Sequence, residues 1–244
     1  MTTTKTNQTP GKNIRFFSSW SGGKDSCLAL HRALTAGAKP AYLLTIISED
    51  GIRSRSHGLR KDVLEAQASA MGIPLLMRCA AWAEYESVFV DALREISKED
   101  VQAGVFGDID FPPHLEWEEK VCAKTGMTAH LPLWGCARET LLHAFLSLGY
   151  KAVIVSVDEK KKLDRKFLGR MIDREIINEF RKIGIDPCGE NGEYHTLVFD
   201  GPIFSKPLLI ETGSITEHSG YCTLDIQIRG VSGNSQNSCA KINN

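Results

Sequence analysis

The chain has 244 residues, of which 42% are hydrophobic and 24% charged, a composition typical of a soluble globular protein. Its formal net charge of −1 argues against a nucleic-acid or membrane partner on electrostatic grounds. The longest apolar runs, at residues 41–47 and 152–157, are too short to cross a bilayer and follow no charged-then-apolar leader, so we expect a cytoplasmic protein of one or two domains.

The first structured stretch of the chain is predicted just after a polar leader. Residues 1–12 are rich in Thr, Lys, Asn and Gln, which predicts a disordered leader. Aromatic and β-branched residues at 13–17 predict a strand, and apolar residues at helical spacing over 27–34 predict a helix. The segment between them, residues 18–26, reads Ser-Ser-Trp-Ser-Gly-Gly-Lys-Asp-Ser and is therefore a strand-to-helix turn.

This turn has the residues of an anion-binding loop. The first N–H groups of a helix lack intrahelical acceptors and carry partial positive charge. Gly22 and Gly23 have no Cβ to keep a phosphate from the backbone, and Lys24 adds a full charge. Ser21 and Ser26 can donate hydroxyl hydrogen bonds.

Asp25 is unusual in such a loop. A carboxylate beside bound phosphates is repelled unless a divalent cation lies between them, so Asp25 indicates Mg²⁺ or a helix N-cap role. Neither GxGxxG nor GxxxxGK[ST] is present. An ordinary glycine turn capped by Asp25 is the alternative interpretation.

The following segments alternate between strand and helix patterns. Strands are expected at 41–47, 74–77, 101–106 and 129–134, and helices at 59–71, 85–95 and 115–125. This alternation predicts a doubly wound five-stranded parallel sheet in an α/β domain over residues 13–136. In such sheets ligands bind at the carboxyl ends of strands, where we place the loop at 21–26, His57 and Asp108.

A second, smaller α/β domain is predicted over residues 137–230, because the pattern changes after Cys136. Helices are expected at 139–148 and 167–182, and strands at 152–157, 208–211 and 221–229. The Ser- and Asn-rich residues 231–244 predict a disordered tail.

Residues 189–196 form the second motif, Gly-Glu-Asn-Gly-Glu-Tyr-His-Thr. Glu190 and Glu193 could hold a metal or orient an amine, and His195 could move a proton. A decorated β-turn is an equal alternative from composition, since Asn-Gly is a strong hairpin signal.

Five motifs together carry a resemblance to a known family. The first resembles the pyrophosphate loop of the N-type ATP pyrophosphatases, which cleave ATP between the α and β phosphates. In chain order the motifs are residues 21–26, Gly107-Asp108-Ile109, Pro132-Leu133-Trp134, Leu168-Gly169-Arg170 and residues 187–196. This set resembles the diphthine–ammonia ligase family over roughly residues 15–211.

The resemblance implies a HUP-type, Rossmann-like ATP-binding domain and a second domain that closes over ATP. It implies a ligase that activates a carboxylate as an acyl adenylate, releases pyrophosphate and transfers the acyl group to ammonia or an amine. On this reading ATP binds residues 21–26 with His57, Gly107 and Asp108, and Asp25 with Asp108 holds Mg²⁺. The predicted catalytic residues are Lys24, Asp25, Glu190, Glu193 and His195.

One segment departs from the family pattern. Residues 107–117 read Gly-Asp-Ile-Asp-Phe-Pro-Pro-His-Leu-Glu-Trp, which is more similar to bacterial relatives than to the members that modify elongation factor 2. The sequence therefore leaves open whether the substrate carboxylate belongs to diphthine on that factor or to a small molecule. A tRNA-modifying enzyme with the same loop and an ATP-binding sensor without turnover are the alternative functions. The oligomeric state is open, with a homodimer as the candidate.

Overall fold

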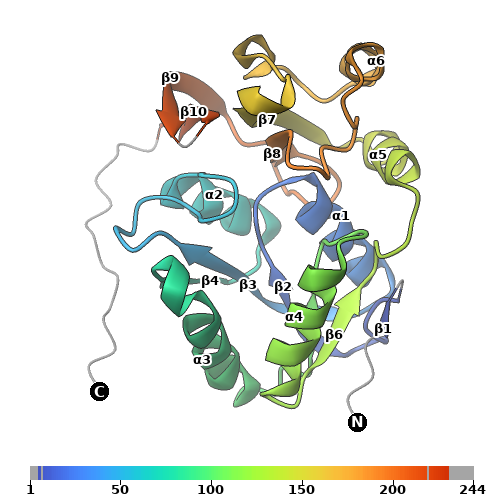
Figure 1. Cartoon of the computed structure of the whole chain (residues 1–244). Helices are drawn as coiled ribbons and strands as arrows, with labels where there is room; N and C mark the ends of the chain where they lie inside the picture. The colour runs from blue at the N-terminus through green and yellow to red at the C-terminus, as the bar shows by residue number, and fades with distance from the viewer. Residues whose placement is uncertain (1–4, 7, 219, 231–244) are drawn as a thin grey trace.

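The computed structural model describes residues 5–6, 8–218 and 220–230. The predicted tail at 231–244, and residues 1–4 and 7 of the predicted leader, lie outside this part. The described chain forms two sheets, one above the other, with helices around and between them (Figure 1).

The first sheet is parallel throughout, in the order β1-β6-β5-β2-β3-β4. Five of its strands are those predicted, so the doubly wound α/β fold is confirmed. They are β2 (Arg15–Ser19), β3 (Lys39–Ile47), β4 (Leu75–Cys79), β5 (Ala103–Val105) and β6 (Thr128–Leu131). Apart from the edge strand β1, the chain order runs outward in both directions from the β2–β5 pair, which makes that pair the switch point where such sheets bind ligands.

A sixth strand corrects the prediction for the leader. β1 (Lys5–Thr6) pairs in parallel with β6, opposite His130 and Leu131. A polar composition does not prevent this pairing, because an edge strand needs only backbone N–H and C=O groups.

Helices cover both faces of the first sheet. They are α1 (Lys24–Thr35), α2 (Lys61–Met71), α3 (Tyr85–Ser97) and α4 (Pro112–Ala123), with a short 3₁₀ helix η1 (Trp82–Glu84). Consecutive strand residues point to opposite faces, so Phe16 packs in the core beneath α1 and α2 while Phe17 packs with Phe89 on the other side. The first sheet is thus covered by helices on both faces, as the predicted alternation of strands and helices requires.

The second sheet is antiparallel, in the order β8-β7-β10-β9. Its strands are β7 (Lys151–Asp158), β8 (Tyr194–Asp200), β9 (Ile210–His218) and β10 (Tyr221–Ile228), preceded by α5 (Arg138–Ser147). The sequence did not predict β8, although Tyr194–Asp200 is rich in aromatic and β-branched residues.

The helix predicted over 167–182 is shorter than expected. Two 3₁₀ helices, η2 (Glu159–Lys161) and η3 (Arg165–Phe167), precede α6 (Arg174–Ile183). Asp173 caps α6 by accepting a 2.8 Å hydrogen bond from the N–H of Ile176. The residues between η3 and α6 instead reach β7, where Met171 bridges Val153.

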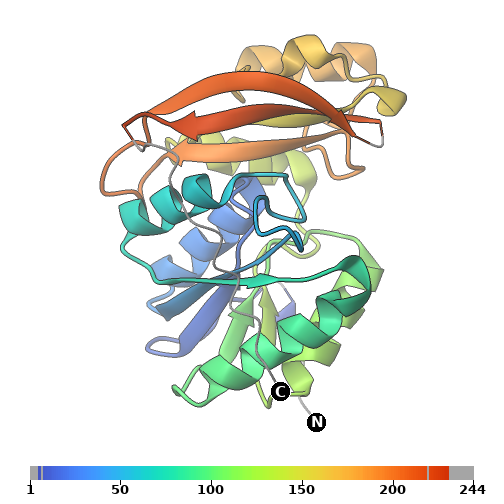
Figure 2. The same ribbon diagram turned by 90° about the vertical axis from the view of Figure 1, so that its left-hand side faces the viewer.

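The two sheets share one hydrophobic core. Figure 2 shows α1 and α2 as a layer between them, with α6 on the far face of the second sheet. One buried cluster continues from Phe16 of the first sheet through Leu30 of α1 to Leu197 of β8 and Ile226 of β10. Among the described residues, none of the helices has the length and apolar character needed to cross a membrane.

Candidate active site

The strand-to-helix turn has the predicted form. α1 begins at Lys24, directly after Gly23. The N–H of Cys27 donates a 3.1 Å hydrogen bond to the Gly23 carbonyl. Ser26 Oγ also donates to that carbonyl, at 3.1 Å, and lies 3.0 Å from Ser21 Oγ. Because Gly23 occupies the N-cap, with no side-chain cap, Asp25 is left for another role.

Three glycines at this site are needed for packing. A Cβ on Gly22 would lie 2.6 Å from Leu59 Cδ1, and one on Gly23 would lie 2.2 Å from His57 Cε1. A Cβ on Gly107 would lie 2.7 Å from the backbone nitrogen of Ser26. Gly107 and His57, which are predicted to bind ATP, therefore both pack against the loop.

Strand β8 is hydrogen-bonded directly to this loop, above the N-terminal end of α1 (Figure 1). The N–H of Lys24 donates to Thr196 Oγ1 at 3.1 Å, and the N–H of Val198 donates to the Gly22 carbonyl at 3.0 Å. The buried Gln67 amide donates to the carbonyls of both Gly22 and Val198. These bonds fix the second sheet against the loop.

The central charge cluster joins Lys24, Asp25 and Glu190. Lys24 Nζ lies 2.7 Å from Asp25 Oδ2 and 3.2 Å from Glu190 Oε1, and the ammonium group is buried. Burial lowers the pKa of Lys24, but the two carboxylates outweigh burial and hold it well above its usual value. Burial, and then the charge of Asp25, raise the pKa of Glu190 to about 7 against the opposing effect of Lys24.

The same cluster offers oxygen ligands to a cation. Ligand atoms of Asp25, Glu190 and Cys188 all lie within 4.8 Å of one another. Burial raises the pKa of the Cys188 thiol, so it keeps its proton and is a poor ligand for a hard cation. Carboxylates beside a loop that is predicted to bind phosphate suit Mg²⁺, which proteins bind through one or two carboxylates plus substrate phosphates.

Glu193 lies in the same motif but in a different setting. Both of its carboxylate oxygens accept 3.0 Å hydrogen bonds from Asn191, one from the backbone N–H and one from the side-chain amide. The carboxylate is thus engaged with the turn at Gly192, whose φ of +76° suits glycine.

Three stacked rings lie beside the loop. His57 stacks on His195 at 4.5 Å between ring centroids, and Tyr221 also stacks on His195, at 6.1 Å. Burial and the neighbouring His195 lower the pKa of His57 well below its usual value. Burial and then Lys24 lower the pKa of His195 to about 4, so both imidazoles are neutral at pH 7.

Asp108, predicted to bind ATP and Mg²⁺, lies in the loop between β5 and α4. Its Oδ1 lies 2.6 Å from Nδ1 of His114. Burial raises the pKa of Asp108, but hydrogen bonds from His114 and Glu118 hold it below its usual value. The charge of Asp108 also contributes to raising the pKa of Asp25, which places the two carboxylates near each other, although Asp108 is not in the group of close ligand atoms.

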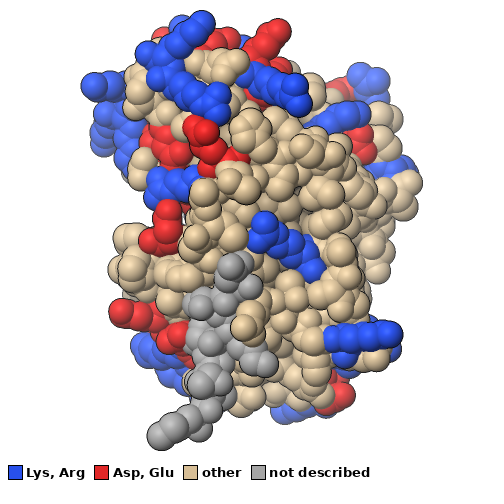
Figure 3. Space-filling view, turned by 90° about the vertical axis from the view of Figure 1, so that its right-hand side faces the viewer, with Lys and Arg blue, Asp and Glu red and all other residues tan. Residues whose placement is uncertain are grey.

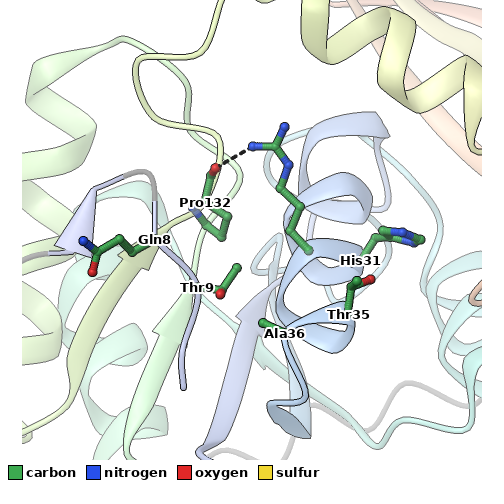
Figure 4. Close-up of a pocket in the computed structure, with 7 residues that line it drawn as sticks. Gln8, Thr9, His31, Thr35, Ala36 and Pro132 are labelled. Atoms are coloured by element: carbon green, nitrogen blue, oxygen red, sulfur yellow. Dashed lines mark hydrogen bonds between the residues drawn. The ribbon is translucent and has the colours of Figure 1, made fainter. Parts of the chain in front are cut away.

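A large cavity lies away from this cluster. It has a volume of about 640 Å³ and lies between the last turns of α1 and the segment preceding β2. Figure 4 shows Gln8 and Thr9 on one side and His31, Thr35 and Ala36 of α1 on the other. None of the predicted site residues lines it.

Charges of both signs are mixed on the face drawn in Figure 3. Lys, Arg, Asp and Glu gather over the second sheet and its helices, while the middle of the face is largely uncharged. A surface that binds RNA typically carries a continuous basic patch, which this mixture does not resemble.

Two family models match the chain. The diphthamide synthase N-terminal domain matches residues 14–129, and the diphthamide synthase C-terminal domain matches residues 137–229. The chain belongs to the diphthamide synthase family. The resemblance inferred from the five motifs is therefore confirmed.

Curated relatives of this family carry the name diphthine–ammonia ligase. Those from Bos taurus and Homo sapiens are each 26% identical over 223 residues, covering 82% of this chain and 84% of theirs. The one from Schizosaccharomyces pombe is 28% identical over 231 residues, covering 85% of this chain and 38% of its own. These relatives support the prediction that the chain is a carbon–nitrogen ligase.

A solved structure is also similar, described as a predicted subunit of tRNA methyltransferase from Methanocaldococcus jannaschii. It is 18% identical, with a TM-score of 0.44, and covers 76% of this chain and 96% of its own.

Proposed function

We propose that this chain catalyses the ATP-dependent amidation of a carboxylate, with AMP and pyrophosphate as products. The observation that carries the proposal is the buried cluster of Lys24, Asp25 and Glu190. It joins the phosphate loop (residues 21–26) to the second motif (residues 189–196). A nucleotide-binding domain without chemistry has no use for a second buried carboxylate beside its loop lysine. The names of the curated relatives point in the same direction.

In the first step an oxygen of the substrate carboxylate attacks the α-phosphorus of ATP. The bond from that phosphorus to the oxygen bridging to the β-phosphorus breaks, and pyrophosphate leaves with both electrons. The Lys24 ammonium and the N–H groups of α1 that follow the N–H bound by Thr196 stabilise the charge that develops on the leaving group. Ser21 donates a hydroxyl hydrogen bond to a phosphate oxygen, and His57 borders the nucleotide. The Ser26 hydroxyl, which donates to the Gly23 carbonyl in this structure, would turn to donate to phosphate as well.

Asp25 would hold Mg²⁺, with Asp108 nearby as a second carboxylate. The ion would neutralise phosphate charge and orient the pyrophosphate group.

In the second step the nitrogen of ammonia attacks the acyl carbon, AMP leaves, and the nitrogen loses a proton. We assign that proton to Glu190, because a pKa of about 7 suits a group that must accept a proton at neutral pH. His195, with a pKa of about 4, is left to position the substrate as a neutral ring. Glu193 supports the turn that carries Glu190.

Product analysis tests this reaction. The protein is incubated with ATP, Mg²⁺ and ammonium, with and without a translation elongation factor that carries diphthine. AMP and pyrophosphate formed only with that factor establish diphthine as the substrate. AMP and pyrophosphate formed instead with a pool of small carboxylates would support the same reaction and assign a small molecule as its substrate.

Two outcomes contradict the proposal. Formation of ADP would mean cleavage between the β and γ phosphates and would exclude the pyrophosphatase reaction. Binding of ATP without turnover on any carboxylate would favour the alternative function, an ATP-binding sensor.

A further inference from the structure

Arg138, the first residue of α5, connects two loops that approach it from different sheets. Its Nε and Nη2 donate to the two carboxylate oxygens of Asp110 at 2.6 and 2.8 Å. Its Nη1 donates to Asp186 Oδ2 at 2.6 Å and to Asn191 Oδ1 at 3.2 Å. One guanidinium therefore holds the loop after β5 and the loop before β8 together.

Each of these loops carries a residue of the site. Asp110 lies two positions after Asp108, in the loop that leaves the carboxyl end of β5. Asp186 Oδ2, besides bonding to Arg138, accepts a 3.2 Å hydrogen bond from the backbone N–H of Glu190. The Asp186 carboxylate thus links Arg138 to the backbone of Glu190.

Further bonds fix the second loop around the same point. Asp186 Oδ1 accepts a 3.0 Å bond from the N–H of Cys188, and the Cys188 thiol lies 3.4 Å from the carbonyl oxygen of Arg138. The side chain of Asp186 is only 13% exposed, so its end of the bridge is shielded from water, whereas the Asp110 side chain is 38% exposed. Other anchors of this loop include Tyr194, whose hydroxyl donates to the Pro187 carbonyl at 2.6 Å.

This arrangement requires an arginine. The planar guanidinium presents N–H groups in two directions at once, so it binds Asp110 with one edge and Asp186 with the other. A lysine at this position has a single ammonium group, which cannot hold two carboxylates in fixed orientations on opposite sides.

We propose that Arg138 is a positioning residue for the amidation reaction: by bonding Asp110 and Asp186, it sets the distance between the loop of Asp108 and the loop of Glu190. The inference rests on the proposed function for its kinetic consequences but not for its structural ones. Arg138 forms no hydrogen bond or ion pair with the side chains of Lys24 or Glu190, and it acts mainly through the two loops. Its charge also lowers the pKa of Glu190, but burial, Asp25 and Lys24 have larger effects. Removal of Arg138 lets the two loops move apart while the phosphate loop keeps its own contacts.

The test compares Arg138→Gln and Arg138→Lys with a matched control, Arg181→Gln. Arg181 also forms a two-pronged ion pair, with both bonds to Glu139 at 3.0 Å, but neither residue touches a site loop. The first measurement is hydrogen–deuterium exchange of the ligand-free protein. Both Arg138 variants are expected to exchange faster at 107–111 and at 186–192 together, while Arg181→Gln matches the wild type there.

The second measurement is the kinetics of AMP formation. A misplacement of about 1 Å costs on the order of 10²-fold in rate, so kcat of Arg138→Gln is expected to fall about 10²-fold. The KM for ATP should rise by a smaller factor than kcat falls, because most of the proposed ATP contacts come from the loop between β2 and α1, and only Gly107 and Asp108 come from the loosened loop. Arg138→Lys is expected to recover only part of kcat, and Arg181→Gln to retain wild-type kinetics.

Several outcomes would overturn the proposal. Wild-type exchange in either loop of both variants would show that Arg138 does not hold the loops together. Full recovery by Arg138→Lys would reduce its role to charge alone, and an equal loss in Arg181→Gln would indicate a general effect on stability. If Arg138→Gln does not fold, the lysine variant carries both measurements. If the wild type forms no AMP, the proposed function fails, whereas exchange still decides the role of Arg138.

Discussion

Thr196 Oγ1 accepts a 3.1 Å hydrogen bond from the backbone N–H of Lys24, across 172 positions of sequence. A residue of the second sheet thereby occupies the first N–H of α1, in the loop predicted to bind phosphate. The neighbouring carbonyl of Thr196 lies 3.0 Å from Nδ1 of His57. The second motif therefore acts on the phosphate loop through its backbone position as well as through its carboxylates.

The first prediction concerns this bond. Thr196→Val keeps the shape of the side chain but leaves the buried N–H of Lys24 without an acceptor, which costs about 1–3 kcal/mol. Thr196→Ser retains the hydroxyl and should lose less. Urea unfolding of the ligand-free proteins measures the difference. Equal stability of the valine variant and the wild type would mean that water or another group replaces Thr196.

The second prediction concerns Lys24. Lys24→Ala removes the charge that stabilises departing pyrophosphate, so pyrophosphate release should fall by about 10²- to 10³-fold. Asp25 and Glu190 lose their counter-charge and take up protons more readily, so we expect the fold to persist. Pyrophosphate release and circular dichroism measure the two effects.

The control is Lys151→Ala, which breaks the 2.9 Å ion pair between Lys151 and Asp200 on the surface. It should leave the rate unchanged, since such pairs contribute little. An unchanged rate in Lys24→Ala would remove the basis for the proposed reaction.

The third prediction is a pH dependence set by Glu190. With a pKa of about 7, Glu190 is mostly protonated at pH 6 and mostly ionised at pH 8. Only the ionised form accepts a proton, so the rate of amide formation should rise with pH, with a midpoint near 7. The concentration of free ammonia, rather than of total ammonium, must be held constant across the series.

Glu190→Gln should remove this inflection and lower the rate at high pH. A midpoint near pH 4 would assign the proton instead to His195, whose pKa is about 4.

The parts of the site that were predicted are those with a local signal. The strand, the glycines and the helix around Lys24 lie within a few residues of one another, so periodicity and turn chemistry are sufficient to place them. The helix boundary at Arg174 also had a local signal, Asp173 as N-cap, which the continuous prediction over 167–182 overlooked.

The residues that were missed act over long separations. Gln67 contacts Val198 at a separation of 131 positions, and Arg138 contacts Asp186 at a separation of 48. A glutamine inside an apolar helix, or an arginine at the start of one, gives no sign of its partner in the sequence. Thr196 was inside a motif that was noticed, but its role depends on the unpredicted strand β8.

The last prediction concerns the buried Glu118. Burial, and then the charge of Asp108, hold the pKa of Glu118 well above its usual value, so the folded protein keeps this proton over a pH range in which the unfolded chain has released it. The unfolded chain ionises the same group near its ordinary pKa. The folded state therefore binds an extra proton, and this residue makes the protein less stable as the pH rises above that value.

Glu118→Gln keeps a hydrogen-bond donor for Asp108 but cannot ionise in either state. Its free energy of unfolding should exceed that of the wild type at pH 7, and the difference should shrink as the pH falls toward 5. The difference should change by up to about 1.4 kcal/mol per pH unit. Urea unfolding between pH 5 and 8 measures it, with the exposed Glu116→Gln as a control that should follow the wild type. A constant difference across this range would mean that Glu118 is ionised in the folded protein.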